Sequence, residues 1–114
     1  MIPLYHDFTD ETVAVFGGGP VGARKARRFA SEADVVVISP EFSEDEYGDA
    51  DLVRARPGPD DIRMWFDRLT PALVVVATND DAVNDAIERE ATRAAVLINR
   101  ADRSAERGPK SVVV

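Results

Sequence analysis

The chain has 114 residues, of which 45% are hydrophobic, and its 21 acidic and 14 basic side chains give a formal net charge of -7. This length fits one domain with a single core. The sequence contains no cysteine, which excludes disulfides, thiolate metal sites and cysteine nucleophiles. Because phosphate backbones bind basic surfaces, the acidic charge argues against nucleic acid as a partner.

The make-up of the charge is also informative, since Lys25 and Lys110 are the only lysines. An acidic, lysine-poor chain rich in alanine and valine resembles proteins from a high-salt cytoplasm. A GC-rich genome, which favours arginine and alanine, is the alternative explanation. The N-terminus lacks a basic region followed by an apolar run, and the apolar stretches are strand-sized, so we expect a cytoplasmic protein without a membrane span.

Apolar runs alternate with helical patterns along the chain, which is typical of a parallel sheet built from βαβ units. We therefore predict an α/β fold, a Rossmann-like parallel sheet with helices on both faces, as one NAD(P)-binding domain over residues 1–114. The predicted strands are 12–16, 34–38, 51–55, 72–77, 95–98 and 111–114. The chain ends within the last apolar run, so we expect either a truncated chain or a partner that supplies the remainder.

Three helices are predicted between these strands. The first runs from about residue 20 to 31, and a short one begins at Asp60. Asn79 or Asp80 can cap the third and longest helix. Its predicted buried stripe consists of Val83, Ala86, Ile87, Ala91 and Ala94.

A glycine-rich segment between the first strand and the first helix fits the G-x-G-x-x-G pattern of dinucleotide-binding sites. Gly17 permits a tight turn, Gly19 lets the backbone approach a diphosphate, and Gly22 lets the helix pack closely on the sheet. Pro20 suits the first helical turn, where no N–H donor is required. Together with Val21, these residues are the predicted diphosphate site, at the positive end of the helix dipole.

Other cofactor contacts are predicted where the second and fourth strands end. NAD-binding proteins commonly carry an acidic residue after the second strand, but Ser39 stands there, with Glu41 two residues on. A serine can bond a ribose hydroxyl without repelling a 2′-phosphate, so these residues do not choose between NAD and NADP. Thr78 and Asn79 could line the ribose side of the cofactor, cap the next helix, or do both.

Five separated segments then match one family in order: 2–5 (IPLY), 17–25 (GGGPVGARK), 38–41 (ISPE), 77–84 (ATNDDAVN) and 99–102 (NRAD). With them the chain resembles the N-terminal domain of the siroheme synthases, the precorrin-2 dehydrogenase / sirohydrochlorin ferrochelatase family. It departs from that family at the polar turn 103–109, and we expect this chain to be without the family's dimerisation region and small C-terminal domain.

The resemblance implies NAD-dependent oxidation of precorrin-2 to sirohydrochlorin, and some family members then insert Fe²⁺. It makes Asp102 the catalytic residue, a carboxylate just past the fifth strand that can accept protons as a general base. From position alone, stabilisation of a turn is the favoured role of Asp102, and the resemblance reverses that preference. The resemblance also favours Arg24 and Lys25 as contacts for the carboxylates of the tetrapyrrole. They belong to a basic cluster with Arg27 and Arg28, and such clusters are more often a solvent-exposed helix face. It further implies a homodimer in the complete protein.

Metal binding by the protein itself is not expected, because His6 is the only histidine and there is no cysteine.

Two other interpretations of the chain compete with the siroheme one. The first is a regulatory nucleotide-sensing domain of a potassium channel or transporter, in which Asp102 has no special role. The second is a truncated dehydrogenase of another kind, without its substrate domain.

Overall fold

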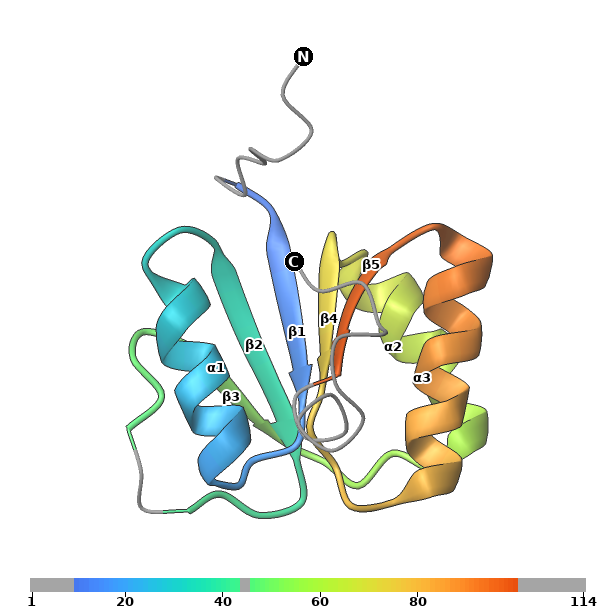
Figure 1. The fold of residues 1–114 in the computed structure, drawn as a ribbon, viewed down its shortest axis with the longest axis horizontal. Helices are drawn as coiled ribbons and strands as arrows, with labels where there is room; N and C mark the ends of the chain where they lie inside the picture. The colour runs from blue at the N-terminus through green and yellow to red at the C-terminus, as the bar shows by residue number, and fades with distance from the viewer. Residues whose placement is uncertain (1–9, 44–45, 101–114) are drawn as a thin grey trace.

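A parallel sheet with the strand order β3-β2-β1-β4-β5 forms the centre of the computed structural model, which describes residues 10–43 and 46–100 (Figure 1). The strands are β1 (Thr12–Phe16), β2 (Asp34–Ser39), β3 (Asp51–Arg54), β4 (Leu73–Val76) and β5 (Leu97–Arg100). The helices are α1 (Pro20–Ala30), α2 (Ile62–Leu69), which follows a short 3-10 turn at Pro59–Asp61, and α3 (Asp81–Ala94). All four strand pairs are parallel, so the predicted Rossmann-like α/β fold is confirmed.

The sheet is covered on both faces, by α1 on one side and by α2 and α3 on the other (Figure 1). Successive side chains of a strand point to opposite faces, so a strand that is apolar at every position needs cover on both. Residues 13–16 of β1 and all four residues of β4 are buried in this way. Of the helices in the described part of the chain, none is long and apolar enough to cross a membrane.

The boundary between α3 and β5 differs from the prediction. The fifth strand was expected at 95–98, but it begins at Leu97, because Ala95 adopts the left-handed conformation (φ 58°) that ends α3. Ala94, predicted on the buried stripe, is exposed, whereas the other four stripe residues are buried. The buried stripe therefore ends at Ala91, three residues before the helix does. The predicted strand 111–114 and His6 lie outside the described residues.

The surface charge leads to a prediction about salt. Every acidic side chain among the described residues is exposed except those of Glu88 and Glu90, which are half-buried. Since molar salt shortens the screening length to about 3 Å, their mutual repulsion should be weakened there. We expect the melting temperature to rise by several degrees between dilute buffer and 2 M KCl, mostly below about 1 M. Thermal unfolding followed by circular dichroism checks this, and a flat response would contradict the high-salt interpretation.

Candidate functional site

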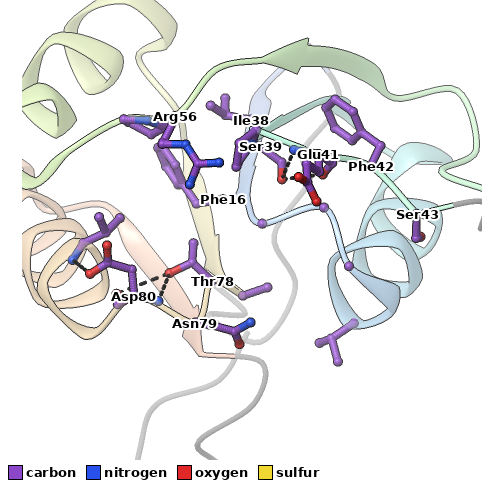
Figure 2. Close-up of a pocket in the computed structure, with 18 of the residues that line it drawn as sticks. Phe16, Ile38, Ser39, Glu41, Phe42, Ser43, Arg56, Thr78, Asn79 and Asp80 are labelled. Atoms are coloured by element: carbon purple, nitrogen blue, oxygen red, sulfur yellow. Dashed lines mark hydrogen bonds between the residues drawn. The ribbon is translucent and has the colours of Figure 1, made fainter.

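A cleft of about 910 Å³ opens where the strands end. All five strands run toward one edge, the lower edge in Figure 1, where α1 and α3 begin. β1 and β4 are neighbours in the sheet, yet the helices that follow them lie on opposite faces, which leaves a crevice between them. The cleft is lined by the β1–α1 turn, by residues after β2 and β3, and by the β4–α3 turn (Figure 2).

The glycines of the β1–α1 turn have distinct surroundings. Gly17 has a φ of +123°, and a Cβ there would lie 2.6 Å from the carbonyl carbon of Ala77, so the turn requires glycine. A Cβ on Gly22 would lie 3.0 Å from the carbonyl carbon of Gly17 and still closer to its oxygen, so α1 packs directly on the turn. A Cβ on Gly19 would meet nothing within 4 Å, because this residue borders open space at the cleft.

Gly18 also belongs to the site, and the G-x-G-x-x-G pattern does not single it out. A Cβ on Gly18 would lie 2.8 Å from Ser39 Oγ and would collide with the carbonyl oxygen of Glu41. The segment after β2 thus packs against the turn at this point. Three consecutive glycines, one more than the pattern requires, were the available signal in the sequence.

The two helices that begin at the cleft differ in how their first N–H groups are satisfied. Asp80 caps α3, and its carboxylate accepts hydrogen bonds from the N–H groups of Ala82 (3.0 Å) and Val83 (3.2 Å). α1 begins after Gly19, which has no side chain to cap it, and its first turn contains no acidic residue. Its N–H groups and positive dipole end are therefore available to an anion. A bound diphosphate would lie at α1 rather than at α3.

Ser39, at the end of β2, is buried, and its Oγ donates a hydrogen bond to the carbonyl oxygen of Glu41 (2.6 Å). The exposed Glu41 side chain and Arg56 line the same part of the cleft (Figure 2). Sequence reasoning did not identify Arg56. It follows β3, which pairs with β2, and the Ala55 N–H bonds the Ser39 carbonyl at 3.0 Å. Its position after a predicted strand was the signal that could have found it.

Thr78 and Asn79, both predicted as cofactor contacts, line the cleft. The Thr78 hydroxyl donates to Asn84 Oδ1 (2.5 Å) and accepts from the Asp80 N–H (3.1 Å), while Asn84 Nδ2 donates to the Thr78 carbonyl (3.1 Å). Asn84 is buried, with 2% of its surface exposed, so it fixes the β4–α3 turn from beneath. Of the two predicted caps of α3, Asp80 takes that role and Asn79 does not.

The cap supports a stability prediction. Replacing Asp80 with alanine removes the acceptor for two N–H groups of α3 and should lower the free energy of unfolding by about 1 kcal/mol. Asp80→Asn, which keeps a side-chain oxygen, should lose much less. Urea denaturation of the three proteins measures the difference. Equal losses for both substitutions would show that charge, and not the hydrogen bonds, makes this cap effective.

Arg24 and Lys25, the predicted substrate contacts, do not line the cleft. Arg24 is exposed on α1, and Lys25 is half-buried beside it. Burial, together with the nearby charges of Arg28 and Arg24, lowers the pKa of Lys25. Asp102 lies outside the described residues, two positions after β5 ends at Arg100. Within 10–43 and 46–100, no group of three or more histidine, aspartate or glutamate side chains is placed to hold a metal ion.

The parallel sheet, the glycine turn, the free start of α1 and the cleft beside it define a Rossmann-like nucleotide-binding domain. Comparison with protein families makes this more specific. Residues 4–108 match the family described as putative NAD(P)-binding, and the chain belongs to that family.

Curated relatives extend the comparison. The chain is 33% identical over 115 residues to a precorrin-2 dehydrogenase of Methanosarcina barkeri, an alignment that covers 89% of this chain and 48% of the relative. It is 31% identical over 107 residues to a siroheme synthase of Pseudomonas fluorescens, covering 91% of this chain and 22% of that protein. The resemblance inferred from the ordered motifs is thereby confirmed. The chain spans about half or less of the length of these relatives.

Solved structures agree with this assignment. The structure of SirC, a precorrin-2 dehydrogenase, superposes with a TM-score of 0.64 at 27% identity, over 89% of this chain and 49% of SirC. The E. coli tRNA N6-threonylcarbamoyladenosine dehydratase TcdA, in complex with AMP, superposes with a TM-score of 0.66 at 14% identity, over 80% of this chain and 50% of that one. The second similarity shows the fold alone.

Proposed function

We propose that this domain takes part in the NAD-dependent oxidation of precorrin-2 to sirohydrochlorin. The observation that carries the proposal is the 33% identity to a precorrin-2 dehydrogenase over 89% of the chain. The similarity to SirC, at 27% identity, supports the same reaction. In this proposal the substrate is a tetrapyrrole, the reaction is cytoplasmic, and the complete protein acts as a homodimer.

The residues of the cleft fit a dinucleotide. The diphosphate would lie against Gly17 and Gly19. It would accept hydrogen bonds from the N–H groups of Val21 and Gly22 at the start of α1, whereas Pro20 has no N–H group to donate. The open space beside Gly19 leaves room for that approach. When bound, NAD⁺ supplies the hydride acceptor.

The adenosine half of the cofactor would lie over the ends of β2 and β3. The Glu41 carboxylate can accept hydrogen bonds from ribose hydroxyls, whereas Ser39 Oγ, which already donates to the Glu41 carbonyl, can only accept one. A carboxylate there disfavours the 2′-phosphate of NADP. Arg56 could stack its planar guanidinium group on the adenine ring. Thr78 and Asn79 would border the cofactor on the β4 side. We therefore propose NAD rather than NADP.

Asp102 is the proposed general base. Loss of a hydride from the tetrapyrrole must be balanced by loss of a proton, which the carboxylate of a residue two positions after β5 in the sequence is proposed to accept. Arg24 and Lys25 are proposed to attract the carboxylates of the substrate, as cations on α1 outside the cleft. That contact requires the tetrapyrrole to extend beyond the dinucleotide cleft along the helix.

The proposal is tested by incubating the protein with precorrin-2 and NAD⁺ in high KCl and following sirohydrochlorin and NADH by absorbance. NAD⁺ binding is measured separately by calorimetry. Turnover that depends on NAD⁺ is the expected result. If NAD⁺ binds but no turnover occurs, the assay is repeated with any coding sequence that follows Val114 included. Binding without turnover in both proteins would overturn the proposal in favour of a nucleotide-sensing domain.

A further inference from the structure

A buried tyrosine lies behind the glycine turn. Tyr47, in the segment that leads from β2 to β3, is 7% exposed, and its ring belongs to the core on the α1 face of the sheet. The ring also packs edge-to-face on Phe42, with centroids 5.7 Å apart and planes at 89°. Such packing fixes the position of the ring, and with it the position of the hydroxyl group.

The Tyr47 hydroxyl donates a hydrogen bond to the carbonyl oxygen of Gly18 and accepts one from the Ser43 N–H (2.9 Å). The Ser43 N–H also points to the Gly18 carbonyl, at 3.1 Å, and Ser43 Oγ lies 3.2 Å from the tyrosine hydroxyl. The Tyr47 hydroxyl and the Ser43 N–H, both from the segment after β2, therefore hold the Gly18 carbonyl of the β1–α1 turn.

The orientation of that carbonyl determines where the next N–H points. In a planar trans peptide the Gly18 carbonyl and the Gly19 N–H point in opposite directions. With the carbonyl held toward Tyr47, the Gly19 N–H is directed away from Tyr47, and both glycines of this peptide line the cleft. A peptide flanked by two glycines has little intrinsic preference for one orientation, so an external restraint has a large influence on it.

We propose that Tyr47 is a positioning residue for the cofactor diphosphate. It does not line the cleft, and it acts through the Gly18–Gly19 peptide by keeping the Gly19 N–H available as a donor. The inference rests on the NAD site of the proposed function and adds the residue that orders it. Tyr47 is 29 positions from Gly18 in the sequence, so this device is visible only in the fold.

The test uses Tyr47→Phe, which retains the packed ring and removes only the hydroxyl. We expect the Kd for NAD⁺ and for ADP to rise about five- to tenfold, the effect of one lost neutral hydrogen bond. The Kd for adenosine, which has no phosphate, should stay the same. The matched control is Thr70→Ala, which removes a hydroxyl that donates to the Leu69 carbonyl (2.8 Å) just after α2, away from the cleft. This control should bind all three ligands like the wild type.

The possible outcomes separate the inference from the proposed function. If Tyr47→Phe binds NAD⁺ and ADP as tightly as the wild type, the inference is wrong even where precorrin-2 is turned over. A lower melting temperature with unchanged affinities would show a merely structural role and would also overturn it, as would an equal loss for adenosine. A wild-type protein that binds neither NAD⁺ nor ADP contradicts it too. Phosphate-specific weakening without precorrin-2 turnover supports the inference and counts against the proposed reaction alone.

Discussion

Replacing Gly22 with alanine is expected to weaken NAD⁺ binding by about ten- to a hundredfold, the effect of losing one hydrogen bond between the start of α1 and the charged diphosphate. The added methyl group would lie 3.0 Å from the carbonyl carbon of Gly17, and closer to its oxygen. Both atoms belong to the backbone of the turn, so no side chain can move aside. The collision can be relieved only if α1 shifts away from the β1–α1 turn. The same overpacking should lower the free energy of unfolding by about 1–3 kcal/mol.

Two other glycines serve as matched controls for Gly22→Ala. Gly19→Ala adds a methyl group that meets nothing within 4 Å, so it should leave the stability unchanged and weaken only NAD⁺ binding, by occupying space at the cleft. Gly58→Ala makes an ordinary contact of 3.5 Å with Asp61 Oδ2, outside the cleft lining, and should change neither property. Calorimetry and urea denaturation of the set measure both effects. A Gly22→Ala protein with wild-type stability and affinity would contradict the close packing of α1 on the turn.

The parts of the site that could be predicted from sequence depend on local geometry. The turn at Gly17 and the close approach at Gly22 involve residues near one another in the chain, so a short pattern reports them. The cap of α3 was narrowed to two candidates and then decided by backbone conformation. Asp80 is extended, with φ -98° and ψ 107°, and its carboxylate can reach back to the first N–H groups of the helix.

The end of α3 shows why the fifth strand was predicted two residues too early. A helix commonly ends at a glycine in the left-handed conformation, but here Ala95 takes that conformation. Without a glycine, the apolar run that follows Ala94 does not reveal where helix gives way to strand. The boundary is fixed instead by tertiary contacts, such as the pairing of Leu97 with Leu73 on β4.

Long-range contacts explain the functional residues that sequence reasoning missed. Nothing in the sequence around Tyr47 indicates that its hydroxyl reaches the carbonyl of Gly18, 29 positions away. Arg56 comes to the cleft only because β3 pairs with β2. Ser39 was predicted correctly at the end of β2, but its hydroxyl donates to the backbone of Glu41, which a pattern of residue types does not reveal.

Asp102→Ala is expected to lower the kcat for precorrin-2 by about 10²–10⁴-fold, the usual contribution of a positioned general acid or base. Its expected effect on the Kd for NAD⁺ is small, because the proposed dinucleotide contacts come from the turn, from α1 and from the ends of β2 and β4. Loss of turnover with retained cofactor binding would therefore separate the chemical step from cofactor affinity. Absorbance kinetics and calorimetry on the same preparations measure the two quantities.

The substitutions around this prediction distinguish a base from a turn residue. Asp102→Asn keeps the size and much of the hydrogen-bonding capacity of the side chain but cannot accept the proton, so it should be about as inactive as Asp102→Ala. If Asp102 only stabilised a turn, Asp102→Asn would instead retain most of the activity. Asp85→Ala removes an exposed carboxylate from α3, outside the cleft lining, and controls for the change in net charge. Equal kcat values for all four proteins would remove Asp102 from the chemistry, and the proton would then have to leave to another group or to water.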